Sequence, residues 1–219
     1  KISLKDRTKY EEQMQQLGNP DLHIKQQNND YKFSEALERP IYFPITYVEP
    51  LSVNQSAVGY DIYSSGARKA AINRSIETNG FLISSRIKLV QDTSNYSFLG
   101  IMPVVDSTLQ SQNDDPFPKV KGIITAVYSV EDILNSVLKL IKNPKANLVV
   151  FDITRKIPEC IFGDENLIIS SSLTEKRIIA VGGREWELVY ILDPSAFAVS
   201  ESRIYLFSGI LISLFLFLM

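Results

Sequence analysis

Residues 42–50 decide the fold, and they read Tyr-Phe-Pro-Ile-Thr-Tyr-Val-Glu-Pro. Aromatic and β-branched residues dominate this stretch, as is typical of a half-buried extended segment. Pro44 and Pro50 limit how much of it can be a central strand, because proline cannot donate a hydrogen bond to a neighbouring strand. Gly-Tyr-Asp-Ile follows at residues 59–62 and places the carboxylate of Asp61 just ahead of an expected helix.

The expected helix begins near Ser64 or Ser65, either of which can cap its N-terminus. Small and apolar side chains between Ala70 and Ile76 give it one face suited to packing on a sheet. Gly80 stands where a left-handed residue commonly ends a helix.

Two strands are expected after this helix. Residues 81–90 alternate late in their run between apolar and charged side chains, and residues 98–105 are almost continuously apolar. A helix followed by two neighbouring strands predicts an antiparallel sheet with helices on one face, which is an α+β layer.

The motifs at residues 42–50 and 59–62, with Glu-Thr-Asn-Gly at 77–80 and Met-Pro-Val-Val at 102–105, resemble the CHASE domain. This family is the extracytoplasmic sensor module of bacterial histidine kinases, cyclic-di-nucleotide enzymes and plant cytokinin receptors. The similarity runs from about Arg7 to the last apolar segment. The resemblance implies two PAS-like lobes, one far from the membrane and one near it, with a stalk helix and a first membrane span before Lys1.

Composition excludes several classes of function. The net charge of −2 gives no case for nucleic acid as a partner. The single cysteine, Cys160, excludes an internal disulfide, and with only one histidine, His23, a metal site such as zinc is not expected. No catalytic residues and no cofactor are expected.

The last residues, from Ile204 to Met219, form an uncharged apolar run. The run is shorter than the roughly 20 residues that a membrane span needs, but the sequence stops inside it. A buried C-terminal helix is the alternative. Because the run is apolar on every side, we interpret residues 203–219 as the start of a truncated transmembrane helix, and the chain as a fragment of a longer protein.

Residues Ser107–Pro118 are polar and proline-containing, and they predict the domain boundary. We expect a ligand-binding, membrane-distal lobe at 1–116 and a membrane-proximal lobe at 117–200. Further strands are expected in the second lobe at Val120–Tyr128, Leu148–Ile153, Arg177–Val181 and Glu185–Leu192, with a helix capped by Ser129. The predicted fold is therefore α+β: two tandem PAS-like lobes with antiparallel sheets, a truncated N-terminal helix and a C-terminal transmembrane helix.

Asp61 is the first candidate for ligand binding. The aspartate that it resembles in the plant cytokinin receptors binds the adenine edge of the ligand from the distal lobe. A carboxylate beside an apolar pocket can accept strong hydrogen bonds from a ligand. The alternative is that Asp61 caps or braces the helix near Ser64. Tyr42 and Tyr47 are candidate pocket walls, and Ile83 and Met102 fall where the wall of the family's pocket would be. For these four, packing in the core is the alternative.

The sequence departs from the plant receptors at most pocket positions, so the resemblance implies an unidentified small-molecule or peptide ligand rather than cytokinin. We expect a periplasmic or extracellular sensor region, held in the inner membrane and working as a homodimer. It would signal to a cytoplasmic histidine kinase or diguanylate cyclase/phosphodiesterase. A membrane-tethered periplasmic binding protein or hydrolase without signalling output is the second hypothesis, and the coding sequence beyond Met219 discriminates the two.

Overall fold

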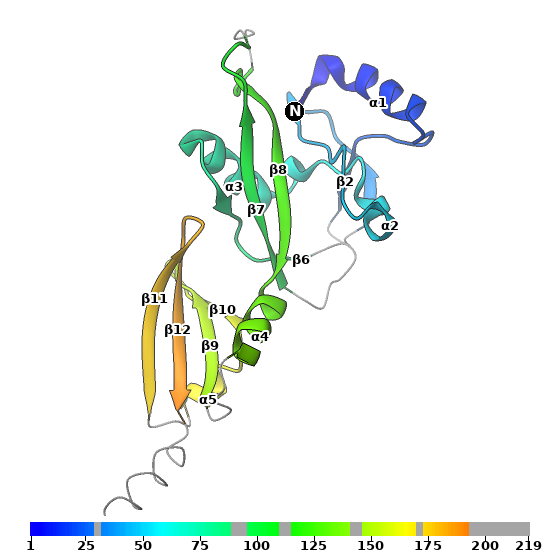
Figure 1. Ribbon diagram of the computed structural model, residues 1–219. Helices are drawn as coiled ribbons and strands as arrows, with labels where there is room; N and C mark the ends of the chain where they lie inside the picture. Colours follow the sequence, from blue (N-terminus) through cyan, green and yellow to red (C-terminus); the bar gives the residue numbers. More distant parts are fainter. Residues whose placement is uncertain (29–31, 89–95, 110–114, 141–145, 170–172, 193–219) are drawn as a thin grey trace, which may run out of the picture. The chain divides into compact units, whose positions relative to one another are not determined.

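The computed structural model describes residues 1–28, 32–88, 96–109, 115–140, 146–169 and 173–192. The chain divides into two compact units, Lys1–Ile133 and Leu134–Met219, and each is described by itself (Figure 1). This division lies later in the chain than the boundary predicted inside Ser107–Pro118. The two strands that flank Ser107–Pro118 pair with each other. The segment therefore connects two strands of one sheet, which explains why its turn-like composition resembles that of a linker.

The central sheet of the first unit is antiparallel and is built around β7 (Tyr96–Val105). On one side β7 pairs from Ser97 to Val105 with β8 (Val120–Ser129), and Figure 1 shows these as two long neighbouring strands. On its other side β7 pairs with two short strands, β5 (Leu82–Ile83) and β6 (Ile87–Lys88). The predicted antiparallel sheet is confirmed, but β8 belongs to this sheet and not to the second lobe.

Helix α3 (Gly66–Thr78) packs on one face of this sheet. Ile72 is fully buried in a core that also contains Leu99 and Ile101 of β7. The Ser75 hydroxyl donates to the backbone oxygens of Gly80, at 2.7 Å, and of Ile101, at 3.3 Å. Residue 79, an asparagine, adopts the left-handed conformation with φ 47°, so the predicted role of Gly80 falls one residue earlier.

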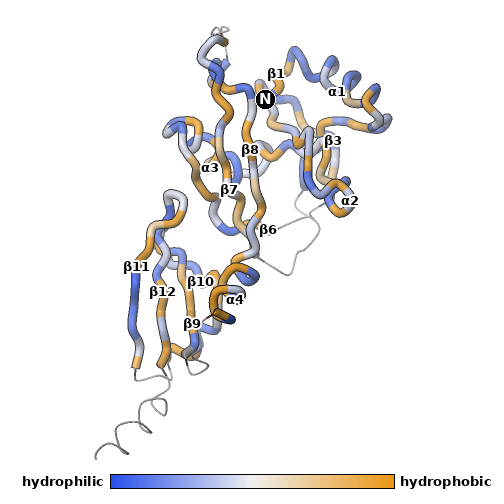
Figure 2. Tube along the Cα trace, in the orientation of Figure 1, coloured by the Kyte–Doolittle hydropathy of each residue, from blue (hydrophilic) through white to orange (hydrophobic). Residues whose placement is uncertain are grey.

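The N-terminal part of the first unit surrounds a second small core. Helix α1 (Arg7–Gln16) confirms the helix expected near the N-terminus and is largely hydrophilic, as its blue colour in Figure 2 shows. It contributes Tyr10 and Met14 to the core, where they pack with Ile24 and Tyr42. The other elements are β1 (Ile2–Ser3), η1 (Leu4–Asp6), β2 (Lys25–Gln27), β3 (Phe33–Glu35), β4 (Ile41–Tyr42), α2 (Leu51–Asn54), η2 (Gln55–Ala57) and η3 (Ile62–Ser64).

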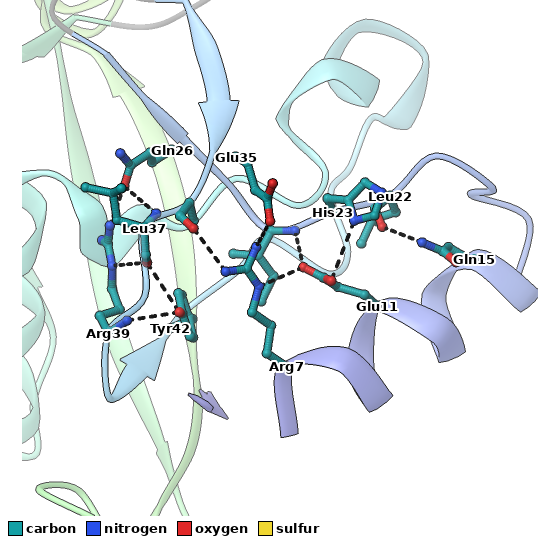
Figure 3. A network of polar contacts seen from close by, with 12 residues as sticks. Arg7, Glu11, Gln15, Leu22, His23, Gln26, Glu35, Leu37, Arg39 and Tyr42 are labelled. Atoms are coloured by element: carbon teal, nitrogen blue, oxygen red, sulfur yellow. Dashed lines mark hydrogen bonds and ion pairs between the residues drawn. The ribbon is translucent and has the colours of Figure 1, made fainter. Parts of the chain in front are cut away.

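A polar network fixes α1 to the strands beside it (Figure 3). The Glu11 carboxylate accepts from Arg7 Nε at 3.0 Å and from the Ile24 backbone N–H at 2.8 Å. Arg7 also donates to the Glu35 carboxylate at 2.8 Å and to the Ala36 backbone oxygen at 3.0 Å. Because Arg7 and Glu11 are one helical turn apart, one ion pair connects α1 both to Ile24, just before β2, and to Glu35 in β3.

The second unit is a four-stranded antiparallel sheet with the strand order β10-β9-β12-β11. Its strands are β9 (Ala146–Asp152), β10 (Glu159–Phe162), β11 (Thr174–Val181) and β12 (Arg184–Leu192). Val149 and Val189 pair across β9 and β12 and are fully buried in its core. The short helix α5 (Asn166–Ile169) contributes Leu167 and Ile168 to this core. Three of these strands confirm sequence predictions, whereas β10 was not predicted.

Helix α4 (Val130–Leu140) follows β8 without an intervening loop and passes from the first unit into the second. The Ser129 hydroxyl accepts a hydrogen bond from the Asp132 backbone N–H at 3.1 Å, which confirms the predicted cap. Among the described residues, no helix is long and apolar enough to cross a membrane. The apolar run Ile204–Met219 lies outside those residues, so the transmembrane helix predicted there stays a prediction.

Candidate ligand site

Asp61 lies between the extended segment after β4 and the start of η3, and its side chain is fully buried. Its Oδ1 atom accepts hydrogen bonds from the backbone N–H groups of Phe43, at 2.8 Å, and Tyr63, at 3.1 Å. Its Oδ2 atom forms an ion pair of 3.1 Å with Nη1 of Arg39. Asp61 therefore caps η3 and braces the extended segment, whereas the alternative considered from the sequence was a cap or brace of the longer helix that follows, α3.

The environment of Asp61 acts on its protonation in opposite directions. Burial is the largest influence and raises the pKa of the carboxyl group above its ordinary value. The two backbone N–H groups and the positive charges of Arg39 and Lys69 act against this and favour the carboxylate. Three protein donors already occupy its oxygens, so Asp61 works as a structural anchor for the residues around it.

The segment braced by Asp61 forms one wall of a cavity of about 560 Å³. The opposite wall is the face of the β7–β8 sheet that carries Leu99 and Thr125. This volume falls within the roughly 300–1,000 Å³ typical of small-molecule sites. The complete lining consists of Ile45, Tyr47, Val48, Glu49, Pro50, Asn54, Ala57, Tyr60, Ile62, Arg68, Ile87, Leu99, Thr125, Ala126 and Val127.

A buried polar pair lines this otherwise mainly apolar cavity. Nη1 of Arg68 donates to the Tyr60 hydroxyl at 3.0 Å, and the guanidinium carbon lies 5.5 Å from the centre of the Tyr60 ring. Both residues are buried, with 7% of Arg68 and 4% of Tyr60 exposed. The cavity thus combines apolar walls with a hydrogen-bonded polar pair, and a few placed polar groups in a mainly apolar wall are typical of small-molecule sites.

A second cavity of about 420 Å³ adjoins the first, because Ile45, Tyr47, Ile62 and Thr125 line both. It extends along β8 toward Lys121 and Gly122. A third cavity, of about 400 Å³, lies apart from these two at the end of α1, where Gly18 and His23 line it. Among the described residues that line these three cavities, a buried charged side chain occurs only in the wall of the first.

In a comparison with known families, the family model of the CHASE domain matches residues 1–162. The chain belongs to the CHASE domain family. The matched region contains the whole first unit and continues to the end of β10 in the second. No curated protein matches the chain. CHASE domains are extracytoplasmic sensor modules rather than catalytic ones, so this region of the protein has a sensor role in signalling.

The CHASE structure does not bring the five predicted site residues together. Tyr42 is fully buried, and its hydroxyl accepts from the Arg39 backbone N–H at 3.0 Å. Ile83 is buried too, whereas Met102 is half-exposed on the face of β7 opposite to Leu99 and the cavity. Tyr47 is 86% exposed and is the only one of the predicted residues that lines the cavity.

Sequence reasoning missed Arg68 and Tyr60, and it also missed the contribution of β8 to the cavity. Arg68 carried a signal, because it is a cation in the first turn of a helix, where the helix dipole disfavours positive charge. Thr125 carried none, since β8 was assigned to the other lobe. Among the described residues, no group of three or more His, Cys, Asp or Glu side chains could hold a metal ion.

Proposed function

We propose that this CHASE domain binds a small molecule in the 560 Å³ cavity and signals its presence to a cytoplasmic output domain. The output is a histidine kinase or a diguanylate cyclase/phosphodiesterase, and the receptor sits in the inner membrane as a homodimer. One observation carries the proposal: a cavity of ligand size beside the central sheet of the first unit has a buried, oriented polar pair in its wall.

Two elements can respond to an occupant of this cavity. Its walls include Tyr47–Pro50, part of a segment outside the sheet, and residues Thr125–Val127 of β8. A ligand that contacts both elements raises the population of the conformation in which they are held together. Since α4 follows β8 directly, a change in the position of β8 is passed to α4, the helix that leaves the first unit.

The test fills the cavity in the full-length receptor. Thr125→Phe adds an aromatic ring on the cavity face of β8, opposite fully buried Ile101, while a β-compatible residue is retained. Met102→Phe is the matched control, because Met102 is 51% exposed on the other face of the sheet and lines none of the three cavities. The output activity of both variants is measured with medium or extract that activates the wild type.

We expect Thr125→Phe to lose the response and Met102→Phe to keep it, at equal amounts of folded receptor in the membrane. A normal response in Thr125→Phe would show that this cavity is not the sensory site. A coding sequence that stops shortly after Met219 would remove the proposed output and favour a tethered binding protein.

A further inference from the structure

β8 is an edge strand of the central sheet. Among the described residues it pairs with β7 on one side and with no strand on the other. Proteins usually protect such an edge with lysine, proline or a β-bulge, because its backbone groups are open to pairing with another chain. β8 has these protections only at its start, where Lys121 lies in a register shift. From Gly122 to Tyr128 the strand has no charged residue and no proline.

The backbone groups of Ile123, Thr125 and Val127 point to this outer edge. Leu99, opposite Val127, is bonded on its far side: its oxygen accepts from the Ser84 backbone N–H at 2.9 Å, and its N–H donates to the Ser84 hydroxyl at 3.0 Å. Leu99 and Val127 therefore form a non-hydrogen-bonded pair of the antiparallel ladder. Such pairs alternate with hydrogen-bonded ones, so Thr125 and Ile123 point outward too. No described residue bonds to the backbone of these three.

The two adjoining cavities run along this edge. Val127 lines the first cavity, Ile123 lines the second, and Thr125 lines both. Ile45 and Tyr47 belong to the wall opposite to β8 in both cavities. Open backbone groups thus lie beside largely apolar walls. An extended peptide satisfies both features, because its main chain pairs with a strand edge while alternate side chains enter pockets on one face.

The first cavity also offers a negative charge to a ligand. Glu49 lines it and is exposed, and no described residue forms an ion pair with it. The other charged side chains that line the two cavities each have a partner within the protein; they are Lys1, Lys121 and Arg68. A free amino group beside Glu49 places the start of a peptide in the first cavity. The peptide then continues into the second cavity toward Gly122, antiparallel to β8.

Resting on the function proposed above, we propose that the small molecule is a short peptide with a free amino group, which pairs antiparallel with the outer edge of β8. About five residues, at roughly 3.4 Å each, cover the span from Val127 to Ile123. The first, third and fifth residues of the peptide direct their backbone groups to β8 and their side chains to the cavities, so these side chains are apolar. The second and fourth direct their backbone groups away from β8.

The test uses the full chain and a pool of synthetic pentapeptides with a free amino group. The first, third and fifth positions carry alanine, valine, leucine, isoleucine or phenylalanine, and the other two carry serine. Peptides retained on the immobilised protein are titrated by calorimetry. Methylation of the backbone nitrogen at the third position removes a hydrogen bond to β8 and should lower the affinity about three- to tenfold. Methylation at the fourth position is the matched control and should leave the affinity nearly unchanged.

Amide hydrogen exchange, followed by NMR, locates the bound peptide on the strand. In the free protein the amides of Ile123, Thr125 and Val127 should exchange faster than those of Ile124 and Ala126, whose backbone groups face β7. A peptide from the pool should slow the exchange of the first three amides and leave the other two unchanged.

Two variants test the contact between Glu49 and the amino group. Each peptide is compared with its acetylated form, which lacks the charge. The wild type should prefer the free amino group by about two- to fivefold, as for an exposed ion pair. Glu49→Gln should abolish this preference. Glu77→Gln removes the same charge from an exposed side chain that lines none of the three cavities, and it should keep the preference.

The absence of binding by every peptide of the pool would overturn the assignment of a peptide ligand. Equal effects of methylation at the third and fourth positions, or unchanged exchange at Thr125, would overturn the pairing with β8. A preference for the free amino group that persists in Glu49→Gln would overturn the role of Glu49. These outcomes differ from a failure of the proposed function, which is a normal signalling response in Thr125→Phe.

Discussion

The carboxylate of Asp61 accepts a hydrogen bond of 2.8 Å from the backbone N–H of Phe43, across 18 positions of the chain. This bond fixes the extended segment 43–50 to the start of η3 and so sets the position of one cavity wall. Asp61, which the sequence predicts as a ligand contact, thus holds the residues of the cavity wall in place and does not line the cavity itself.

Asp61→Ala should therefore destabilise the fold, whereas the sequence predicted a loss of ligand response in an intact fold. The change leaves two backbone N–H groups without their acceptor and Arg39 without its ion-pair partner. We expect the free energy of unfolding to fall by about 3–5 kcal/mol, as when one partner of a buried ion pair is removed. Urea denaturation measures this.

Asp61→Asn is the matched control, because its amide oxygen can still accept from Phe43 and Tyr63. It should cost clearly less than Asp61→Ala. Equal stability of the alanine variant and the wild type would contradict the anchoring role.

Gly59→Ala should be strongly destabilising. Gly59 has φ +81°, and a Cβ atom there would lie 2.8 Å from the backbone oxygen of His23. The left-handed conformation and the clash with backbone together should cost about 2–4 kcal/mol. Gly66→Ala is the comparison, since a Cβ at Gly66 meets nothing within 4 Å. It should be neutral or slightly stabilising. Similar melting temperatures of the two variants would refute the strain at Gly59.

Glu11→Gln should weaken the attachment of α1 and flatten the loss of stability in acid. Burial is the largest single influence on Glu11 and would raise its pKa, but the hydrogen bonds from Ile24 and Arg7 outweigh it and lower that pKa. The unfolded chain then binds a proton more readily than the folded chain. The stabilisation is present above pH 4.5, the ordinary pKa of the group, and is lost as pH falls below it.

The measurement is the free energy of unfolding of each variant between pH 7 and pH 3. At pH 7, Glu11→Gln should cost about 1–3 kcal/mol, and the difference from the wild type should shrink toward pH 3. Glu12→Gln removes the same charge from the exposed side of α1 and should follow the wild-type curve. A difference that stays constant with pH would contradict the ion-pair argument.

In the second unit, two ion pairs of different burial give a further contrast. Arg184 and Asp152 pair across β12 and β9 with only 11% and 6% of their side chains exposed. Arg184→Ala leaves a buried carboxylate without its partner and should cost about 3 kcal/mol. Lys176 pairs with Glu187 at a site where 58% of the lysine is exposed, so Lys176→Ala should cost less than about 1 kcal/mol. Thermal denaturation of both variants decides whether burial sets the order.

Elements with strong periodicity could be predicted from the sequence. The apolar face of α3 and the strand expected at Glu185–Leu192 gave the correct type of element at nearly the correct bounds. The boundary in Ser107–Pro118 was misplaced because composition reports where the chain turns. It does not report whether the strands before and after the turn pair, as β7 and β8 do.

Of the five candidate site residues, only Tyr47 lines the cavity. The carboxylate of Asp61 was recognised, but its partner Arg39 precedes it by 22 positions, and no local pattern joins the two. Met102 was predicted to line the pocket and does not, whereas Thr125 was not predicted and does. Residues of a strand alternate between the two faces of a sheet, and the register that decides the face comes from tertiary pairing. Arg68 could have been found by asking why a cation begins an amphipathic helix.

The direct junction of β8 and α4 has a mechanical consequence. Ser129 ends the strand and Val130 begins the helix, so no loop residue is left to absorb torsion between them. Thr125, Ala126 and Val127, which line the cavity, lie within one short stretch of rigid backbone from that helix. A small rotation of the strand about its long axis should therefore rotate the helix by a comparable angle. Insertion of a single glycine after Ser129 should add a flexible residue at this junction. The rotation of the strand would then no longer be passed to the helix, while the strand and the helix themselves stay intact.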